Sequence, residues 1–113
     1  MATYVIDYFE LPVQSAPASS AFFTKAFGFG SQAYGDGYIE VRDGGVLGGL
    51  YSGEDKAVAP LLGIRTDDIA AAEKAIVAAG GTITRAIYAY PGGKRFYFRE
   101  PGGVELLVYQ PDA

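Results

Sequence analysis

Two stretches of nearly the same sequence decide how this chain is expected to fold: RDGGVLGGLY at residues 42–51 and REPGGVELLVY at residues 99–109. When Pro101 is left out, both stretches carry Gly-Gly-Val at the same place and end in tyrosine. Such a repeat predicts a duplicated unit, in which neither copy is long enough to bury both faces of its sheet alone. We therefore predict one domain built from two related modules, residues 1–55 and 56–113.

The first half of the chain changes from strand-like to helix-like sequence and back. Residues 4–13 are rich in β-branched and aromatic side chains, which predicts a strand. Residues 15–27 begin with a serine and an early proline and stop at Gly28, which predicts a helix. The glycine-punctuated run 28–54 predicts three short antiparallel strands. The predicted order is strand, helix and three strands.

The second half repeats this order. Residues 60–65 predict a short strand, and Thr66 or Asp67 is expected to cap a helix that runs through Ala79. Three further strands are predicted at residues 82–90, 95–99 and 104–109. The sequence therefore predicts an α+β fold made of two tandem βαβββ modules.

Composition narrows the possible classes of protein. Half of the 113 residues are apolar and 19% are charged, which is enough apolar surface for a packed core. The net charge of −4 and the scattering of the nine Lys and Arg residues give no support for a nucleic-acid partner. The sequence contains no cysteine and no histidine, which excludes disulfides and the Ser-His-Asp and Cys-His catalytic arrangements.

The start of the sequence, MATYVIDYFELPV, lacks the basic and apolar regions of a secretory signal peptide. No apolar run approaches the roughly 18 residues that a membrane-spanning helix needs. We therefore expect a cytoplasmic protein without a membrane partner.

Five segments, taken in order, resemble the vicinal oxygen chelate (VOC) superfamily, which includes glyoxalase I, extradiol dioxygenases and bleomycin-resistance proteins. They are YFELPV (8–13), FFTKAFGF (22–29), GGVLGGLY (44–51), TDDIAAAEKAIVAAGGTI (66–83) and FREPGGVELLV (98–108). The resemblance covers nearly the whole chain, and its specificity comes from the order and spacing of the segments. It implies that each module curls into a half-barrel of mixed sheet with its helix outside, and that the pair lines a cavity.

The resemblance also implies where a metal would bind. Metal-dependent members of the superfamily place ligands, usually His or Glu, on the first and last strand of each module. The matching positions in this sequence hold Tyr8, Leu47, Leu61 and Glu105. A divalent catalytic metal needs about three protein ligands, and only Glu105 is an ordinary one. We therefore expect no cofactor, with a tightly bound divalent metal possible but disfavoured.

Strand alternation separates two faces of the predicted sheet. The apolar face is expected to pack under the helices and consists of Phe9, Leu11, Val13, Ile39, Val41, Leu62, Ile64, Phe96 and Phe98. The other face carries tyrosine, arginine and carboxylate side chains, which suits a pocket for a planar, partly polar molecule. The predicted ligand-binding residues are Tyr8, Glu10, Tyr38, Arg65, Arg95, Tyr97 and Tyr109. Tyrosines also suit a pleated surface, so a purely structural role is the competing interpretation.

Glu105 and Tyr8 are the candidate catalytic residues. A carboxylate within VELLVY is expected at a cavity or at an exposed edge, because burial without a partner is costly. In a cavity, Glu105 could act as a general base or acid without a metal, with Tyr8 in an electrophilic or orienting role.

These residues leave more than one function open. The leading hypothesis is a glyoxalase/bleomycin-resistance-like protein that binds a small, planar or amphipathic molecule in a cavity between its two modules, without a tightly bound metal. The alternative is a lyase, isomerase or dioxygenase-type enzyme that uses Glu105 as base or metal ligand. A third hypothesis is a module whose role is association. Because members of the superfamily often dimerise, the resemblance also implies a homodimer.

Overall fold

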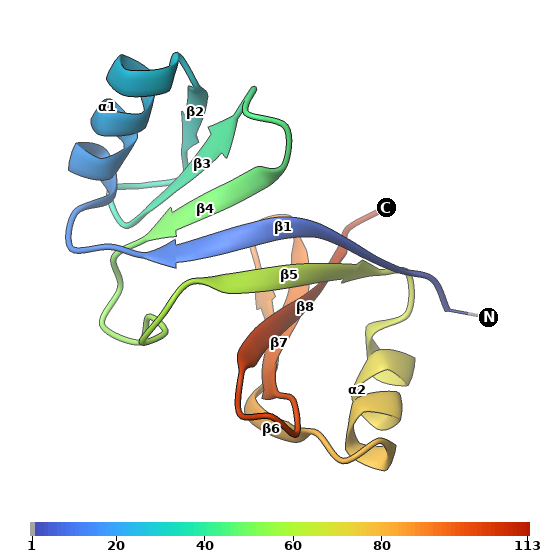
Figure 1. Cartoon of the computed structure of the whole chain (residues 1–113). Helices are drawn as coiled ribbons and strands as arrows, with labels where there is room; N and C mark the ends of the chain where they lie inside the picture. The colour runs from blue at the N-terminus through green and yellow to red at the C-terminus, as the bar shows by residue number, and fades with distance from the viewer. Residues whose placement is uncertain (1) are drawn as a thin grey trace. The chain divides into compact units, whose positions relative to one another are not determined.

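The structure of the chain is a computed structural model that describes residues 2–113. It contains two compact units, coloured along the chain in Figure 1. The N-terminal unit is Tyr8–Leu61, and the C-terminal unit is Leu62–Ala113 together with the segment that ends at Asp7. Each unit packs one helix on a mixed sheet, so the predicted α+β class is confirmed.

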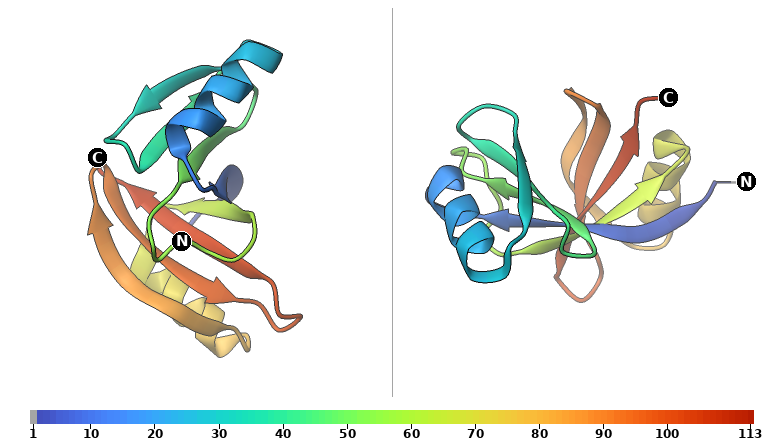
Figure 2. Two further views of the ribbon diagram at one scale, coloured as in Figure 1. Left: turned by 90° about the vertical axis from the view of Figure 1, so that its left-hand side faces the viewer. Right: turned by 90° about the horizontal axis from the view of Figure 1, so that it is seen from above.

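The N-terminal unit contains the first five elements of the chain. They are β1 (Tyr4–Pro12, of which residues from Tyr8 onward belong to this unit), α1 (Ala16–Phe27), β2 (Gly30–Ala33), β3 (Tyr38–Arg42) and β4 (Leu47–Tyr51). The strands lie in the order β1-β4-β3-β2; β1 and β4 are parallel, and the other neighbours are antiparallel. Figures 1 and 2 show α1 lying along β2 and β3, which it contacts together with β4.

The C-terminal unit repeats this order of elements. It contains β5 (Leu61–Thr66, of which residues from Leu62 onward belong to this unit), α2 (Ile69–Ala78), β6 (Thr82–Tyr90), β7 (Gly93–Arg99) and β8 (Glu105–Pro111). The strands lie in the order β5-β8-β7-β6, with β5 parallel to β8 and the other neighbours antiparallel. The helix α2 contacts β6, β7 and β8, as Figure 2 shows from two sides. No helix in residues 2–113 is long and apolar enough to cross a membrane.

The predicted ends of α1 are confirmed by the contacts at its termini. Ser15 is the N-cap, and its hydroxyl accepts a hydrogen bond from the backbone N–H of Ala18. Gly28 ends the helix with φ +76°, a left-handed conformation that glycine adopts without strain, and its N–H donates to the carbonyl of Thr24.

The predicted start of α2 is wrong by one or two residues. Asp68, and neither Thr66 nor Asp67, is the N-cap, and its carboxylate accepts from the N–H of Ala71 at 3.0 Å. Thr66 still belongs to β5, so its backbone cannot begin a helix, and its hydroxyl accepts from the N–H of Asp68. Asp67 turns instead to the N–H of Thr3, at 2.8 Å.

Apolar side chains form one core under each helix. In the N-terminal unit Ala16 of α1 packs with Ile39, Val41 and Leu50, joined by Phe9, Leu11 and Val13. In the C-terminal unit Ile69 and Ala72 of α2 pack with Phe96, Phe98 and Val108, joined by Ile64. The predicted apolar face is therefore confirmed except at Leu62, which is 51% exposed. Leu62 precedes Ile64 on β5 but lies outside the cluster around α2.

The corrected cap gives a test of the fold. Replacing Asp68 by Ala removes the acceptor for an N-terminal N–H of α2, so we expect the free energy of unfolding to fall by about 1 kcal/mol. The neighbouring variant Asp67→Ala loses only an exposed contact and should change it by less than about 0.5 kcal/mol. Urea unfolding of both variants and of Asp68→Asn measures the difference. A larger loss in Asp67→Ala than in Asp68→Ala would contradict the assignment.

Candidate functional site

In the N-terminal unit, two predicted ligand-binding tyrosines meet above a glycine. The hydroxyls of Tyr8 on β1 and Tyr38 on β3 are hydrogen-bonded to each other. Both lie over Gly49 on the intervening strand β4, where a Cβ atom would overlap the Tyr38 hydroxyl and press on that of Tyr8. Gly49 thus has a local physical role, because a glycine at this position leaves the space in which the two phenols meet.

Two carboxylates accompany the tyrosine pair. Glu10 and Glu40 both have Gly49 as their register partner, that is, the residue whose Cα lies opposite on the neighbouring strand. Glu10 is only 2% exposed. The carboxylate of Glu40 receives a hydrogen bond and ion pair from Nε of Arg42 at 2.6 Å. The structure therefore brings three predicted residues, Tyr8, Glu10 and Tyr38, to one face of this sheet.

The surroundings of Tyr8 keep its hydroxyl protonated. Burial raises the pKa of Tyr8 above its usual value, and Tyr38, Glu10 and Glu40 raise it further. At neutral pH the side chain is therefore a neutral phenol that can donate a hydrogen bond. A metal ligand would have to be the phenolate, the form that this environment opposes.

The donor set does not fit the divalent metal of the metal-dependent VOC proteins. Tyr8 and Leu47, two of the four matching positions, are register partners on β1 and β4, and Leu47 offers no donor atom. Residues 2–113 contain no group of three or more His, Cys, Asp or Glu side chains that could hold an ion. About three protein ligands are the usual requirement, and neither Tyr8 nor Leu47 is an ordinary one.

In the C-terminal unit, arginine and tyrosine alternate across all four strands. Arg65 on β5 is the register partner of Tyr109 on β8, Tyr109 of Arg95 on β7, and Arg95 of Tyr88 on β6. Register partners point to the same face of a sheet, so these four side chains form one line, here called the Arg–Tyr row. Their neighbours in sequence, such as Phe96, pack under α2, so the row lies on the face away from the helix.

A second line lies beside the Arg–Tyr row on the same face. Leu107 on β8 pairs with Tyr97 on β7, which pairs with Arg85 on β6. Leu107 and Tyr97 are buried, whereas Arg85 is partly exposed. Arg85 reaches this face because the register of β6 shifts between Ile83 and Arg85, so that an extra residue stands opposite β7.

One end of the Arg–Tyr row is fixed by a carboxylate. Asp7 accepts a hydrogen bond from the Tyr109 hydroxyl at 2.6 Å and forms an ion pair with Nε of Arg65 at 2.9 Å. Burial raises the pKa of Tyr109, and the hydrogen bond to Asp7 raises it further. Asp7 was not among the predicted residues. The available sequence signal was its place directly before Tyr8, where it is the only acidic residue among residues 1–7.

The candidate catalytic residue Glu105 lies at another edge of this face. It begins β8, is partly buried, and its carboxylate accepts a hydrogen bond from the Thr84 hydroxyl at 2.6 Å. Its register partner is Arg99. The structure therefore places Glu105 on the same sheet as Arg65, Arg95, Tyr97 and Tyr109, in contact with a threonine on β6.

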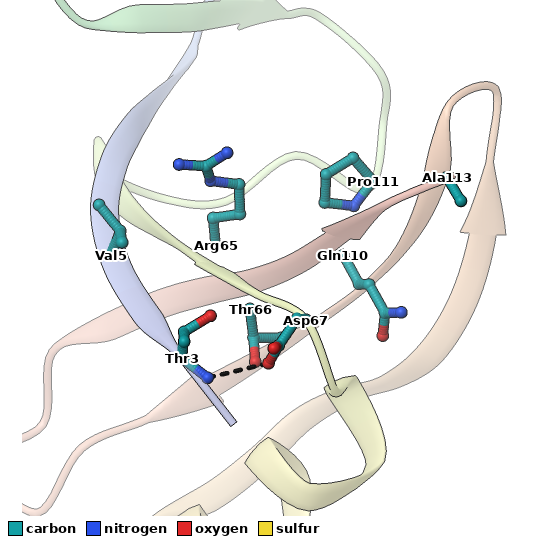
Figure 3. Close-up of a pocket in the computed structure, with 8 residues that line it drawn as sticks. All are labelled: Thr3, Val5, Arg65, Thr66, Asp67, Gln110, Pro111 and Ala113. Carbon is teal, nitrogen blue, oxygen red and sulfur yellow. Dashed lines mark hydrogen bonds between the residues drawn. The ribbon is translucent and has the colours of Figure 1, made fainter. Parts of the chain in front are cut away.

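A pocket of about 430 Å³ opens at one end of the C-terminal unit. Figure 3 shows the eight residues that line it: Thr3, Val5, Arg65, Thr66, Asp67, Gln110, Pro111 and Ala113. Gln110 is directed toward α2, where its side-chain carbonyl accepts from the N–H of Ile69. Of the predicted ligand-binding residues, only Arg65 lines this pocket. The pocket therefore adjoins the β5 end of the Arg–Tyr row.

Comparison with known proteins agrees with this description of the fold. The model of the Glyoxalase/Bleomycin resistance protein/Dioxygenase superfamily matches residues 5–108. A comparison with curated proteins finds no significant match.

Several solved structures are similar to the chain. A member of the same superfamily from Vibrio splendidus 12B01 is 18% identical, with a TM-score of 0.70 over 99% of this chain and 100% of that one. A Streptomyces coelicolor methylmalonyl-CoA epimerase in complex with 2-nitronate-propionyl-CoA is 18% identical, with a TM-score of 0.72 over 96% and 95%. The Mn(II)-bound glyoxalase from Novosphingobium aromaticivorans is 16% identical, with a TM-score of 0.63 over 96% of this chain and 40% of that one. At these identities the likeness shows the fold alone.

The raised pKa of Tyr8 predicts how stability depends on pH. A raised pKa in the folded state stabilises the protein below the unfolded value of about 10, and this contribution is lost as the pH rises above it. We expect the urea midpoint to fall above about pH 10, and Tyr8→Phe to reduce that slope while costing about 1 kcal/mol at pH 7. Urea titrations at several pH values measure both. Tyr34→Phe, at an exposed tyrosine, is the control, and an unchanged slope in Tyr8→Phe would contradict the assignment.

Proposed function

Because the chain belongs to the Glyoxalase/Bleomycin resistance protein/Dioxygenase superfamily, we propose that it binds a small, planar or amphipathic molecule and works without a tightly bound metal. The observation that carries this proposal is the Arg–Tyr row on the face of β5-β8-β7-β6 away from α2. The row combines flat aromatic surface with hydrogen-bond donors, the two features that orient such a ligand.

The side chains on this face differ in how accessible they are. Leu107 is 1% exposed and Tyr97 is 6% exposed, so both lie below the accessible surface. Arg65, Tyr88 and Arg95 stand beside them with more of their side chains accessible. A planar molecule would lay its ring on the tyrosine surface and direct its polar atoms to the guanidinium groups.

The absence of a suitable donor set supports the metal-free part of the proposal. Tyr8, at the position of the first expected metal ligand, is a neutral phenol that is hydrogen-bonded to Tyr38. The register partner of Tyr8 is Leu47. Binding proteins need no metal, whereas the metal chemistry of the superfamily needs the ligands that these positions lack.

Ligand binding is tested by a thermal-shift screen with planar, amphipathic compounds. A compound that binds only the folded chain raises its melting temperature as the ligand concentration increases. For a compound found in this way, Tyr88→Ala should weaken binding about tenfold, because it removes aromatic contact surface. Tyr34→Ala, at an exposed tyrosine of the other unit, should leave the affinity unchanged. Equal effects of the two variants would contradict the assigned face.

Metal content is tested on protein without a histidine tag. After incubation with Mn²⁺, Fe²⁺, Ni²⁺ or Zn²⁺ and dialysis, mass spectrometry should find far less than one ion per chain. The double variant Tyr8→His, Leu47→His places two ordinary ligands on register partners and should retain more Zn²⁺ or Ni²⁺ than the natural chain. Near-stoichiometric metal in the natural chain would overturn the metal-free proposal.

A further inference from the structure

We propose that the exposed aromatic side of α1 is the contact surface for a second copy of this chain. This surface, here called the aromatic patch, consists of Phe22, Ala26 and Phe27, all three of which are exposed. It belongs to the N-terminal unit, where α1 packs on β2, β3 and β4 (Figure 1). The inference concerns association and does not depend on the proposed small-molecule function.

Two inner rings hold the two outer rings of the patch in place. Phe22 and Phe27 are 59% and 61% exposed, and their ring centroids lie 6.2 Å apart in an edge-to-face arrangement. Phe22 also packs edge-to-face on Phe23 at 5.4 Å. Phe27 stacks on Phe29 at 5.5 Å, and both inner rings pack against the core of the unit. The exposed rings are therefore positioned before a partner arrives, which lowers the conformational entropy lost on association.

The composition of α1 is that of a helix with a covered outer side. A surface helix carries charged side chains on the face away from its core. The 12 residues of α1, APASSAFFTKAF, contain one charged side chain, Lys25, and no carboxylate. The helix α2, by contrast, carries Glu73 and Lys74. Exposed phenylalanines that contact each other form a continuous apolar surface, and such surfaces on folded proteins mark interaction sites.

The shape of the aromatic patch suits contact with a copy of itself. Ala26 follows Phe22 by about one helical turn and directly precedes Phe27, so a small side chain stands beside two large ones. In a two-fold contact the same surface meets itself, and each pairwise contact occurs twice. A ring of one copy can lie over Ala26 of the other and receive a ring over its own Ala26 in return. Helices commonly pack in this way, with side chains of one in the grooves of the other.

The distribution of charge also favours a second copy at this surface. The chain has 13 acidic and nine basic residues, so contact between two copies generally opposes like charges. The aromatic patch itself contains no charged residue. Lys25 beside it is basic, whereas Asp43 precedes Gly44, where an added Cβ would lie 3.0 Å from the ring of Phe29. Two copies of this surface can therefore meet without a uniform like charge between them.

The size of the helix sets the expected affinity. One helix of 12 residues is about 18 Å long and presents less surface than the roughly 800 Å² per partner of a standard interface. We therefore expect a reversible dimer in exchange with the monomer, with a dissociation constant on the order of 10–100 µM.

Association is measured by sedimentation equilibrium of the natural chain between about 5 µM and about 1 mM. The mean mass should rise with concentration from that of one chain toward that of two, as expected for this dissociation constant. ¹H–¹⁵N NMR spectra over the same range locate the contact. Backbone signals of residues 18–29 should shift with concentration, whereas those of α2 should not.

Matched variants test the location. Phe22→Glu places a carboxylate on the aromatic patch and should weaken association at least about tenfold. Ala26→Glu should do the same while leaving every ring of the aromatic cluster in place. Val77→Glu, at an apolar residue of α2 that is 55% exposed, makes the same change in charge and should leave the dissociation constant unchanged. Circular dichroism and urea unfolding confirm that each variant is folded.

Three results would overturn the inference. The first is a chain that stays monomeric at about 1 mM; if it instead sediments with phosphatidylglycerol vesicles, the aromatic patch meets a lipid surface. The second is a dimer that Phe22→Glu and Ala26→Glu weaken no more than Val77→Glu does. The third is a dimer lost only in Ile6→Glu, at a residue of β1 that is 62% exposed, which would place the contact on that strand. None of these results bears on ligand binding, so the proposed function is tested separately.

Discussion

The packing of one helix on one face of each four-stranded sheet is the constraint on which the rest of the structure depends. In the C-terminal unit, Phe96 is fully buried and Val108 is 1% exposed beneath α2. Burial of such apolar side chains stabilises the sheet, at roughly 25 cal/mol for each Å² of apolar surface removed from water. Because successive side chains alternate between faces, this packing directs Arg95, Tyr97 and Tyr109 to the other side. The polar face is thus a geometric consequence of the core.

The same alternation explains how far the sequence could predict the structure. The strands, both helices and the apolar face followed from periodicity and glycine positions, because these patterns report local backbone geometry. Arg85 escaped prediction because simple alternation places it with Ile83 under α2. The register shift in β6 moves it beside Tyr97, and such a shift depends on pairing with β7, which one strand's sequence does not reveal. The start of α2 was misplaced because β5 extends as far as Thr66, which the local sequence did not reveal.

The tyrosine pair of the N-terminal unit shows how a buried polar cluster is held together in this sheet. Tyr8 and Leu47, two positions at which the resemblance led us to expect metal ligands in metal-dependent relatives, are register partners on β1 and β4. Glu10, which is 2% exposed, and the two phenols form a largely buried cluster of polar side chains. Buried polar groups need hydrogen-bond partners within the protein. The Tyr8–Tyr38 contact over Gly49 contributes to this satisfaction. The sequence indicated that a metal was disfavoured, but only the three-dimensional structure identified Tyr38 as the hydrogen-bond partner of Tyr8.

The distribution of arginine is the last link between the fold and the proposed ligand. The chain carries a net charge of −4, yet Arg65, Arg85, Arg95 and Arg99 all belong to the polar face of one sheet. Long-range attraction between exposed charges is screened by salt, so selectivity for a ligand has to come from groups within a few ångströms of it. Guanidinium groups stacked on tyrosine rings supply such local donors, and their stacking limits the side-chain freedom lost on binding. A site of this kind would discriminate by the ligand's shape and by the position of its charge.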